Sequence, residues 1–112
     1  MTRGQTFLCG ANQRYARVPR LSRWIVSWPF LRLELAADAF VLRPVRALAW
    51  VGTRRFAYAG VAEARLVRGR GYARIRIRLT DAGEGILSVT TLNDGARELA
   101  ERLRAAGVDV RR

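Results

Sequence analysis

The sequence predicts a mainly β domain that ends in one α-helix, and three observations carry this prediction. Apolar and polar residues alternate with a period of two in several segments between residues 30 and 91, which is typical of half-buried strands. Glycine, proline and aspartate, which favour turns, stand between these segments. From residue 93 to residue 107 the apolar period changes to that of an amphipathic helix.

The alternating segments predict six strands. In residues 30–36, the side chains of Leu31, Leu33 and Leu35 share one face, and residues 40–43 return as the hairpin partner. The other four expected strands are residues 54–60, 61–67, 72–80 and 86–91. Between them, residues 44–53 have no clear period, and Gly52 there marks a turn or a bulge.

The predicted helix covers residues 93–107. Asn93 or Asp94 is expected to cap its N-terminus, because their side chains accept hydrogen bonds from free backbone N–H groups. Gly107 is expected just beyond the C-terminus, where the chain adopts a left-handed conformation. Leu99 and Leu103 fall on the apolar stripe, so we expect them to be buried against the strands.

The composition indicates one domain and restricts its chemistry. The 112 residues include 21 with positive charge (all arginine), nine acids, one cysteine and no histidine, for a net charge of +12. Histidine is the commonest general base and metal ligand, so the sequence predicts no catalytic residue, no metal site and no cofactor. We therefore expect the chain not to be an enzyme.

The longest apolar run, residues 24–31, is shorter than the roughly 20 residues that a membrane-spanning helix needs. The sequence therefore predicts no transmembrane segment. A single cysteine cannot form an intrachain disulfide, so nothing favours an oxidising compartment. The expected location is cytoplasmic, with peripheral contact on the inner face of the membrane as an option.

Residues 1–23 are predicted to be a basic, disordered arm in front of a domain that covers residues 24–112. The segment contains five arginines and no acid, and its apolar residues have no sustained period. A disordered arm and a mis-assigned start codon both explain such a segment, and the sequence does not choose between them.

The order of these elements resembles that of the bacterial pleckstrin-homology-like (PH-like, GRAM-related) small domain proteins. The segments that carry the resemblance are "SWPFLRLEL", "FVLRP", "RRFAYAGVAEARLV", "GRGYARIRIRLT" and "ILSVTTLNDGARELAERLRAAG". The resemblance implies a partly open barrel of two packed antiparallel sheets capped by the helix. It also implies seven strands, so either residues 46–50 supply the seventh or one is absent. A small split barrel and an α+β sheet with one covering helix are the alternatives.

One group of candidate binding residues lies in "YARIRIRLT", where Arg74, Arg76 and Arg78 alternate with buried-type residues. Arginines on alternate strand positions stand about 6.6 Å apart on one face. Such a row is typical of a solvated strand face, and it also fits phosphates, acidic headgroups or the acidic side chains of a partner.

A second group of candidate binding residues brackets residues 44–53: Arg43, Arg46, Arg54 and Arg55. If that segment is a loop, these arginines are expected to gather at one end of the barrel, and ordinary loop charge is the alternative explanation. In eukaryotic PH relatives a basic loop near the first hairpin binds phosphoinositide headgroups. Only Arg43 and Arg46 lie near the matching place, and the lipid-binding lysine pattern is absent.

Five aromatic residues are predicted to pack in the core or at sheet edges rather than to stack on a ligand: Trp24, Trp28, Phe30, Phe40 and Trp50. The resulting hypothesis is a non-enzymatic interaction module that docks on a protein partner or on itself. Peripheral binding to an anionic membrane is the first alternative, and non-specific nucleic-acid binding is the second. The basic charge favours an acidic partner of any kind and does not choose among them.

Overall fold

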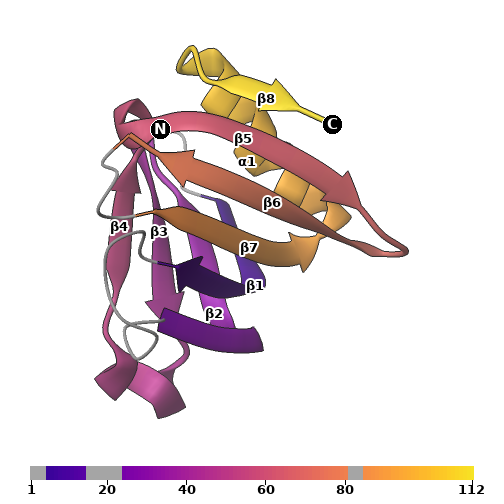
Figure 1. The fold of residues 1–112 in the computed structure, drawn as a ribbon. Coiled ribbons are helices and arrows are strands. Elements are labelled where there is room, and N and C mark those ends of the chain that lie inside the picture. The colour runs from indigo at the N-terminus through magenta and orange to yellow at the C-terminus, as the bar shows by residue number, and fades with distance from the viewer. Residues whose placement is uncertain (1–4, 15–23, 81–84) are drawn as a thin grey trace.

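The computed structural model describes residues 5–14, 24–80 and 85–112, which form one curled β-sheet with a helix packed against it (Figure 1). The elements follow one another in this order: β1 (Gln5–Arg14), β2 (Trp24–Leu35), β3 (Ala39–Pro44), the 3-10 helix η1 (Arg46–Val51), β4 (Arg54–Ala57), the 3-10 helix η2 (Tyr58–Gly60), β5 (Val61–Arg68), β6 (Tyr72–Leu79), β7 (Ile86–Leu92), α1 (Asn93–Ala105) and β8 (Asp109–Arg111). The prediction of a mainly β fold with one C-terminal helix is confirmed.

The eight strands lie in the order β4-β3-β2-β1-β7-β6-β5-β8. Neighbouring strands are antiparallel except for β5 and β8, which are parallel. The sheet curls into a half-barrel, and α1 lies behind β5 and β6 in Figure 1. The two sheets expected from the sequence are therefore the two halves of one continuous sheet, joined by the pairing of β1 with β7.

The prediction that residues 1–23 form a disordered arm is wrong for residues 5–14, which form β1 near the middle of the sheet. The domain therefore begins before residue 24. The inward positions of this strand include Cys9, Ala11 and Gln13, which are buried but small or polar. The strand lacks the alternation of large apolar side chains that marks β6, and so the sequence pattern did not reveal it. Residues 1–4 and 15–23 lie outside the described part of the chain.

The predicted number of six strands is also wrong, because β1 and the short β8 raise the number within the described residues to eight. Residues 46–51, a candidate for the missing strand, form η1 instead. Gly52 follows η1 with a φ of 89°, a left-handed conformation that glycine adopts without steric cost. The other predicted strands are present with shifted ends; for example, residues 61–67 belong to β5.

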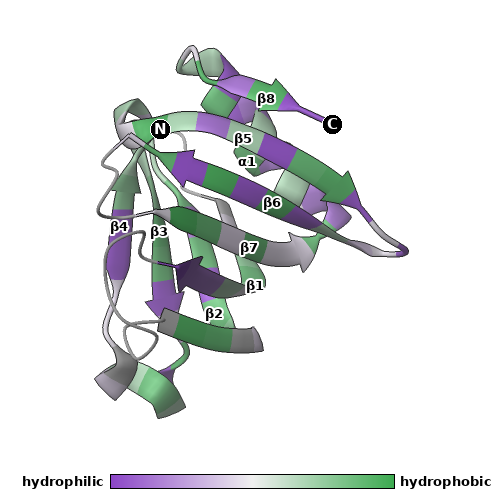
Figure 2. Cartoon of the chain, in the orientation of Figure 1, coloured by the Kyte–Doolittle hydropathy of each residue, from purple (hydrophilic) through white to green (hydrophobic). Residues whose placement is uncertain are grey.

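Alternating side chains on β6 show how the sheet separates core from solvent. Ile75, Ile77 and Leu79 are buried, whereas Arg74 and Arg76 are exposed, and Figure 2 shows the resulting bands of colour along β6. On the core side, Phe40 stacks on Phe56 with ring centroids 5.2 Å apart and on Tyr58 at 6.3 Å. The helix contributes two fully buried leucines to the same core, as predicted: Leu99 and Leu103.

The two ends of α1 differ from each other. At the C-terminus the Val108 N–H donates to Leu103 O at 2.9 Å and the Gly107 N–H to Arg104 O at 3.0 Å, while Gly107 has a φ of 88°. This is the glycine-terminated end that the sequence predicted. At the N-terminus the capping prediction is wrong, because Leu92 occupies the cap position and makes no side-chain capping hydrogen bond.

Candidate functional site

Arginines dominate the outer surface of β6, β5 and β8, on the side of the sheet opposite α1. We call five exposed residues the arginine face: Arg65, Arg74, Arg76, Arg78 and Arg111. The period-two alternation of each strand directs these side chains to solvent, because the intervening residues pack on the core. On β5, for example, Ala64 and Leu66 are buried on either side of Arg65.

Strand register brings three of these arginines into one row. Arg76 on β6 stands opposite Arg65 on β5, and Arg65 stands opposite Arg111 on β8. Neighbouring strands lie about 4.8 Å apart, so the three backbones are separated by two such steps. Like charges directly opposite each other on paired strands destabilise a sheet. The row therefore concentrates positive charge at a cost to the free energy of folding.

Acidic residues neutralise only one border of the arginine face. Glu63 accepts a hydrogen bond from Arg78 with Nε and Oε1 3.2 Å apart, and Asp109 accepts one from Arg111 at 3.0 Å. Arg65, Arg74 and Arg76 have no ion pair with any other residue in the described part of the chain. The centre of the arginine face thus has three unneutralised guanidinium groups.

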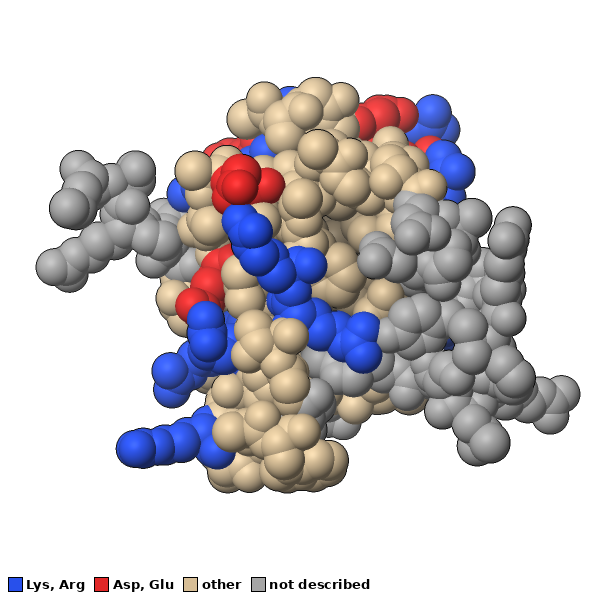
Figure 3. Space-filling view, turned by 90° about the vertical axis from the view of Figure 1, so that its left-hand side faces the viewer, with Lys and Arg blue, Asp and Glu red and all other residues tan. Residues whose placement is uncertain are grey.

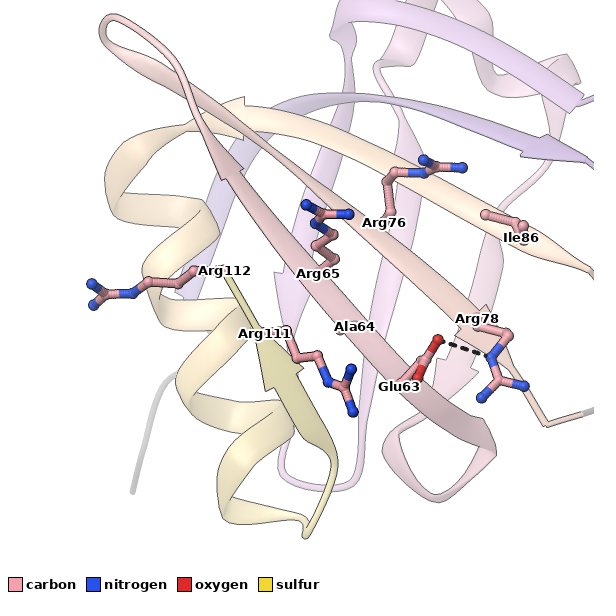
Figure 4. Close-up of a pocket in the computed structure, with 8 residues that line it drawn as sticks. All are labelled: Glu63, Ala64, Arg65, Arg76, Arg78, Ile86, Arg111 and Arg112. Carbon is pink, nitrogen blue, oxygen red and sulfur yellow. Dashed lines mark hydrogen bonds and ion pairs between the residues drawn. The ribbon is translucent and has the colours of Figure 1, made fainter.

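The surface at the row is hollowed. A shallow cavity of about 490 Å³ lies there, and eight residues line it: Glu63, Ala64, Arg65, Arg76, Arg78, Ile86, Arg111 and Arg112. Figure 4 shows Arg65 and Arg76 rising from neighbouring strands, the Glu63–Arg78 ion pair at one side, and Arg112 pointing away from the other arginines. Guanidinium groups present several N–H donors in a plane, so this hollow suits carboxylate or phosphate oxygens.

The structure places the two predicted groups of arginines on different parts of the sheet. Arg74, Arg76 and Arg78 lie together on the outer face of β6, as expected. By contrast, Arg43 and Arg55 lie on the half formed by β2, β3 and β4, where each meets a carboxylate. Their Nε–Oε2 and Nη2–Oδ1 distances to Glu34 and Asp38 are 2.6 and 2.8 Å, respectively.

Arg54 and Arg46 complete the second group. Arg54 donates to Oε1 of the buried Gln13 at 3.1 Å, so it holds β4 to β1. Arg46 is exposed on η1. None of the four arginines in this group lines the hollow between β6, β5 and β8. Figure 3 views the molecule from the side of β4 and shows arginine and acidic side chains next to one another there.

Three residues that line the hollow were not predicted from the sequence: Arg65, Arg111 and Arg112. Arg65 could have been found, because only four residues separate the predicted strands 61–67 and 72–80, and a hairpin between these strands sets Arg65 opposite Arg76. Nothing in the sequence pattern indicates β8, a strand of three residues, so the position of Arg111 became visible only in the structure.

The groups that could perform acid–base or nucleophilic chemistry are few in the described residues. Cys9 is fully buried, and this burial raises the pKa of its thiol to about 12, so the thiol stays protonated and out of reach of solvent. The hydrogen bond from Arg55 lowers the pKa of Asp38. No cluster of three His, Cys, Asp or Glu side chains in residues 5–14, 24–80 and 85–112 could hold a metal ion.

The aromatic residues divide into buried and exposed groups. Phe40 is buried, as expected, but Trp50 on η1 is 83 % exposed, and Trp28 and Phe30 on β2 are about half exposed. The prediction that these residues serve in packing is therefore wrong for Trp50. The side chain of Trp24 lies outside what the structure describes.

Comparison with known proteins adds no assignment: no protein-family model matches the chain, and no curated protein matches it at significant similarity. Within the described residues, no helix is long and apolar enough to cross a membrane.

Proposed function

We propose that the chain is a non-enzymatic, PH-like interaction module that docks on an acidic surface of a partner protein through the arginine face. One observation carries the proposal: the row Arg76–Arg65–Arg111 sets like charges side by side on three strands, with no acid to neutralise its centre among the described residues. Such a row lowers the stability of the free protein, because like charges repel each other across paired strands. Carboxylates of a partner that bind the row would relieve this repulsion.

An acidic partner fits this surface better than a second copy of the chain. Each copy carries a net charge of +12, and a symmetric contact would press one arginine face against another. Arginine is enriched at protein interfaces, where its planar guanidinium binds carboxylates through two hydrogen bonds. Self-association through the arginine face is therefore disfavoured, whereas docking on a cluster of aspartates or glutamates is favoured.

The proposed PH-like relationship is supported by the element order. The strands run β4-β3-β2-β1-β7-β6-β5 in the sheet, as two antiparallel halves that share the β1–β7 junction. The helix α1 follows β7, which is the last of these seven strands along the chain. A cytoplasmic location belongs to the same proposal. It is supported by the free cysteine, which is buried and unbridged.

The test compares two triple variants with the same change in net charge. The first replaces Arg65, Arg76 and Arg111 with glutamine; the control replaces Arg43, Arg46 and Arg55. Binding to poly-L-glutamate is measured by isothermal titration calorimetry over a series of salt concentrations. Three exposed ion pairs at roughly 0.2–1 kcal/mol each predict that the first variant binds about 3- to 150-fold more weakly.

The control variant should lose much less affinity, because Arg43 and Arg55 are each paired with an acid and Arg46 lies away from the row, whereas only Arg111 of the row has an acidic partner among the described residues. Equal losses in the two variants would mean that only the net charge matters. In that case the arginine face would not be a docking site.

Peripheral binding to an anionic membrane is a second candidate, favoured by the exposure of Trp50. This ring is 83 % exposed on η1, which also carries the exposed Arg46. Tryptophan beside a basic residue is typical of segments that enter the headgroup region of a bilayer. Sedimentation with phosphatidylserine vesicles should then depend on Trp50, and a Trp50→Ala variant that sediments like the unaltered protein would exclude this candidate.

A further inference from the structure

A second hollow crosses the outer surface of the sheet beside the arginine face. It spans β6, β7, β1 and β2 and has a volume of about 480 Å³, within the range of about 300–1,000 Å³ that is usual for ligand sites. We call it the strand groove. It contains Arg74 and Arg76 of β6 at one side and Trp28 of β2 at the other.

The middle of the strand groove is lined by small residues that face one another across β7 and β1, and Ala11, Arg14, Val26 and Ile86 complete the lining. Thr90 of β7 lies between Arg74 and Gly10, and Ser88 lies between Arg76 and Asn12. Two hydroxyls and one carboxamide therefore line a trough that bulky side chains would fill. The Oδ1 atom of Asn12 is buried and has no hydrogen-bond partner. An unpaired buried oxygen of this kind costs roughly 1–3 kcal/mol, so the floor leaves one hydrogen bond unmade.

An irregularity in β2 places Trp28 at the groove. Cys9 pairs with Leu31 and Ala11 pairs with Val26, so residues 27–30 of β2 stand opposite the single residue Gly10. The pairing of β2 with β1 is interrupted here, and Trp28 is 50 % exposed where it lines the hollow. An exposed aromatic ring therefore faces a groove whose other side is unneutralised arginine.

We propose that the strand groove binds a nucleotide unit, with the base stacked on Trp28 and the phosphate held by Arg74 and Arg76. Three interstrand steps separate β6 from β2, a distance of about 14 Å between backbones that the arginine side chains shorten. A nucleotide carries a flat ring at one end and an anion at the other, and sugar hydroxyls between them match Ser88, Thr90 and Asn12.

Acidic peptides fit this groove less well than they fit the arginine face. A carboxylate forms an ion pair with arginine but does not stack on an indole, whereas every base has a face that stacks on an aromatic ring. The nucleotide unit can come from a free nucleotide or from a single-stranded nucleic acid. The chemistry at the groove is the same for both, so the experiment includes one arm for each source.

The test measures binding of two probes to the full chain by fluorescence anisotropy: a labelled ATP analogue and a labelled 12-nucleotide oligo-dT. Base stacking on an aromatic side chain is worth about 1–3 kcal/mol per base, so Trp28→Leu should weaken binding about 5- to 150-fold. Trp28→Phe, which keeps a ring, should retain most of the affinity. Binding of oligo-dT alone would assign the groove to a nucleic-acid strand, and binding of ATP would assign it to the free nucleotide.

Two controls separate stacking from simple charge attraction. Trp50→Leu removes an exposed indole outside the groove and should leave both affinities unchanged, and poly-L-glutamate should bind the Trp28→Leu variant as tightly as the unaltered protein. The proposal is overturned if neither probe binds, or if Trp28→Leu binds them like the unaltered protein. It is also overturned if Trp50→Leu weakens binding as much as Trp28→Leu. The poly-L-glutamate result tests the docking function separately, because it depends on the row Arg76–Arg65–Arg111.

Discussion

The two halves of the curled sheet differ in how many of the arginines that form their candidate groups meet an acid. On the half formed by β2, β3 and β4, Arg43 pairs with Glu34 and Arg55 pairs with Asp38. On the half formed by β6, β5 and β8, the row centred on Arg65 sets arginine beside arginine, and acids meet only its border. Arg43 and Arg55 thus have acidic partners, although Arg32 stands opposite Arg43 on the same half, whereas in the row centred on Arg65 only Arg111 meets an acid within the described part of the chain.

This difference shows that the number of arginines says little about where a basic protein binds a partner. Exposed ion pairs contribute about 0–1 kcal/mol each and present little net field to a partner. Unmatched arginines lower stability slightly and leave their donors free for a ligand. A binding surface is therefore better located by the positions where acids are missing than by the positions where arginines are frequent.

The largest expected effect follows from removing the strand that joins the two halves. Deleting residues 1–14 removes β1, whose backbone pairs with β2 on one side and β7 on the other. Both neighbours would lose their hydrogen-bond partner, and Cys9 and Ala11 would leave the core. We expect the truncated chain to lose its cooperative thermal transition, as measured by circular dichroism.

The matched control for this deletion is Leu8→Ala, which changes a side chain on the same strand that is 45 % exposed. It should shift the melting temperature little. A truncated chain that still melts cooperatively near the original temperature would show that the halves fold without β1.

The next largest effect tests whether the two halves unfold together. Leu103→Ala removes a fully buried side chain from α1. Such substitutions cost roughly 2–5 kcal/mol. Because all three tryptophans belong to β2 and η1, tryptophan fluorescence reports on the half away from β8, and circular dichroism reports on the whole fold. The two signals should shift to the same lower denaturant midpoint.

Leu92→Ala is the control for Leu103→Ala, since Leu92 precedes the helix and is 50 % exposed. It should lower the free energy of unfolding much less. Separate midpoints for the two signals in Leu103→Ala would show that the halves are independent units rather than one cooperative fold.

The smallest effects have opposite signs in the two halves. Arg65→Glu places a carboxylate between Arg76 and Arg111, and each new cross-strand pair should add about 0.2–1 kcal/mol to the free energy of unfolding. Glu34→Gln breaks the pair with Arg43 and should remove about 0–1 kcal/mol. Urea unfolding at low salt measures both changes, and both should shrink at 1 M salt, where screening acts within about 3 Å.

Arg65→Glu should also weaken binding of poly-L-glutamate while it stabilises the fold. An Arg65→Glu variant that is less stable than the unaltered protein and binds poly-L-glutamate equally well would contradict the proposal that the row centred on Arg65 carries unmatched charge for a partner.

Sequence patterns predicted the elements in which large apolar residues alternate or recur. The inward face of β6 was predicted from Ile75, Ile77 and Leu79, and the buried face of α1 was predicted from Leu99 and Leu103. The outward direction of Arg74, Arg76 and Arg78 followed from the same alternation. These are local properties of one strand or one helix, and the chain carries them without reference to its tertiary contacts.

Local patterns failed where a strand is defined by its neighbours. β1 has Cys9, Ala11 and Gln13 at inward positions, and only its pairing with β2 and β7 identifies it as central. Likewise, β8 is only three residues long, and it is a strand because it pairs in parallel with the edge of β5. Backbone hydrogen bonds across a sheet depend on position in space rather than on side-chain period, so neither strand has a strong signature in the sequence.

By itself, the amino-acid sequence determined the mainly β class, the terminal helix, the strongly basic charge and the outward-facing arginines of β6. Tertiary structure alone decided which arginines became neighbours. It set Arg65 and Arg111 beside Arg76, it provided acids for Arg43 and Arg55, and it brought Trp28 to the groove that Arg74 and Arg76 border. The physical reason is that strand alternation fixes the side on which a residue projects, whereas the register between distant strands fixes what it meets there.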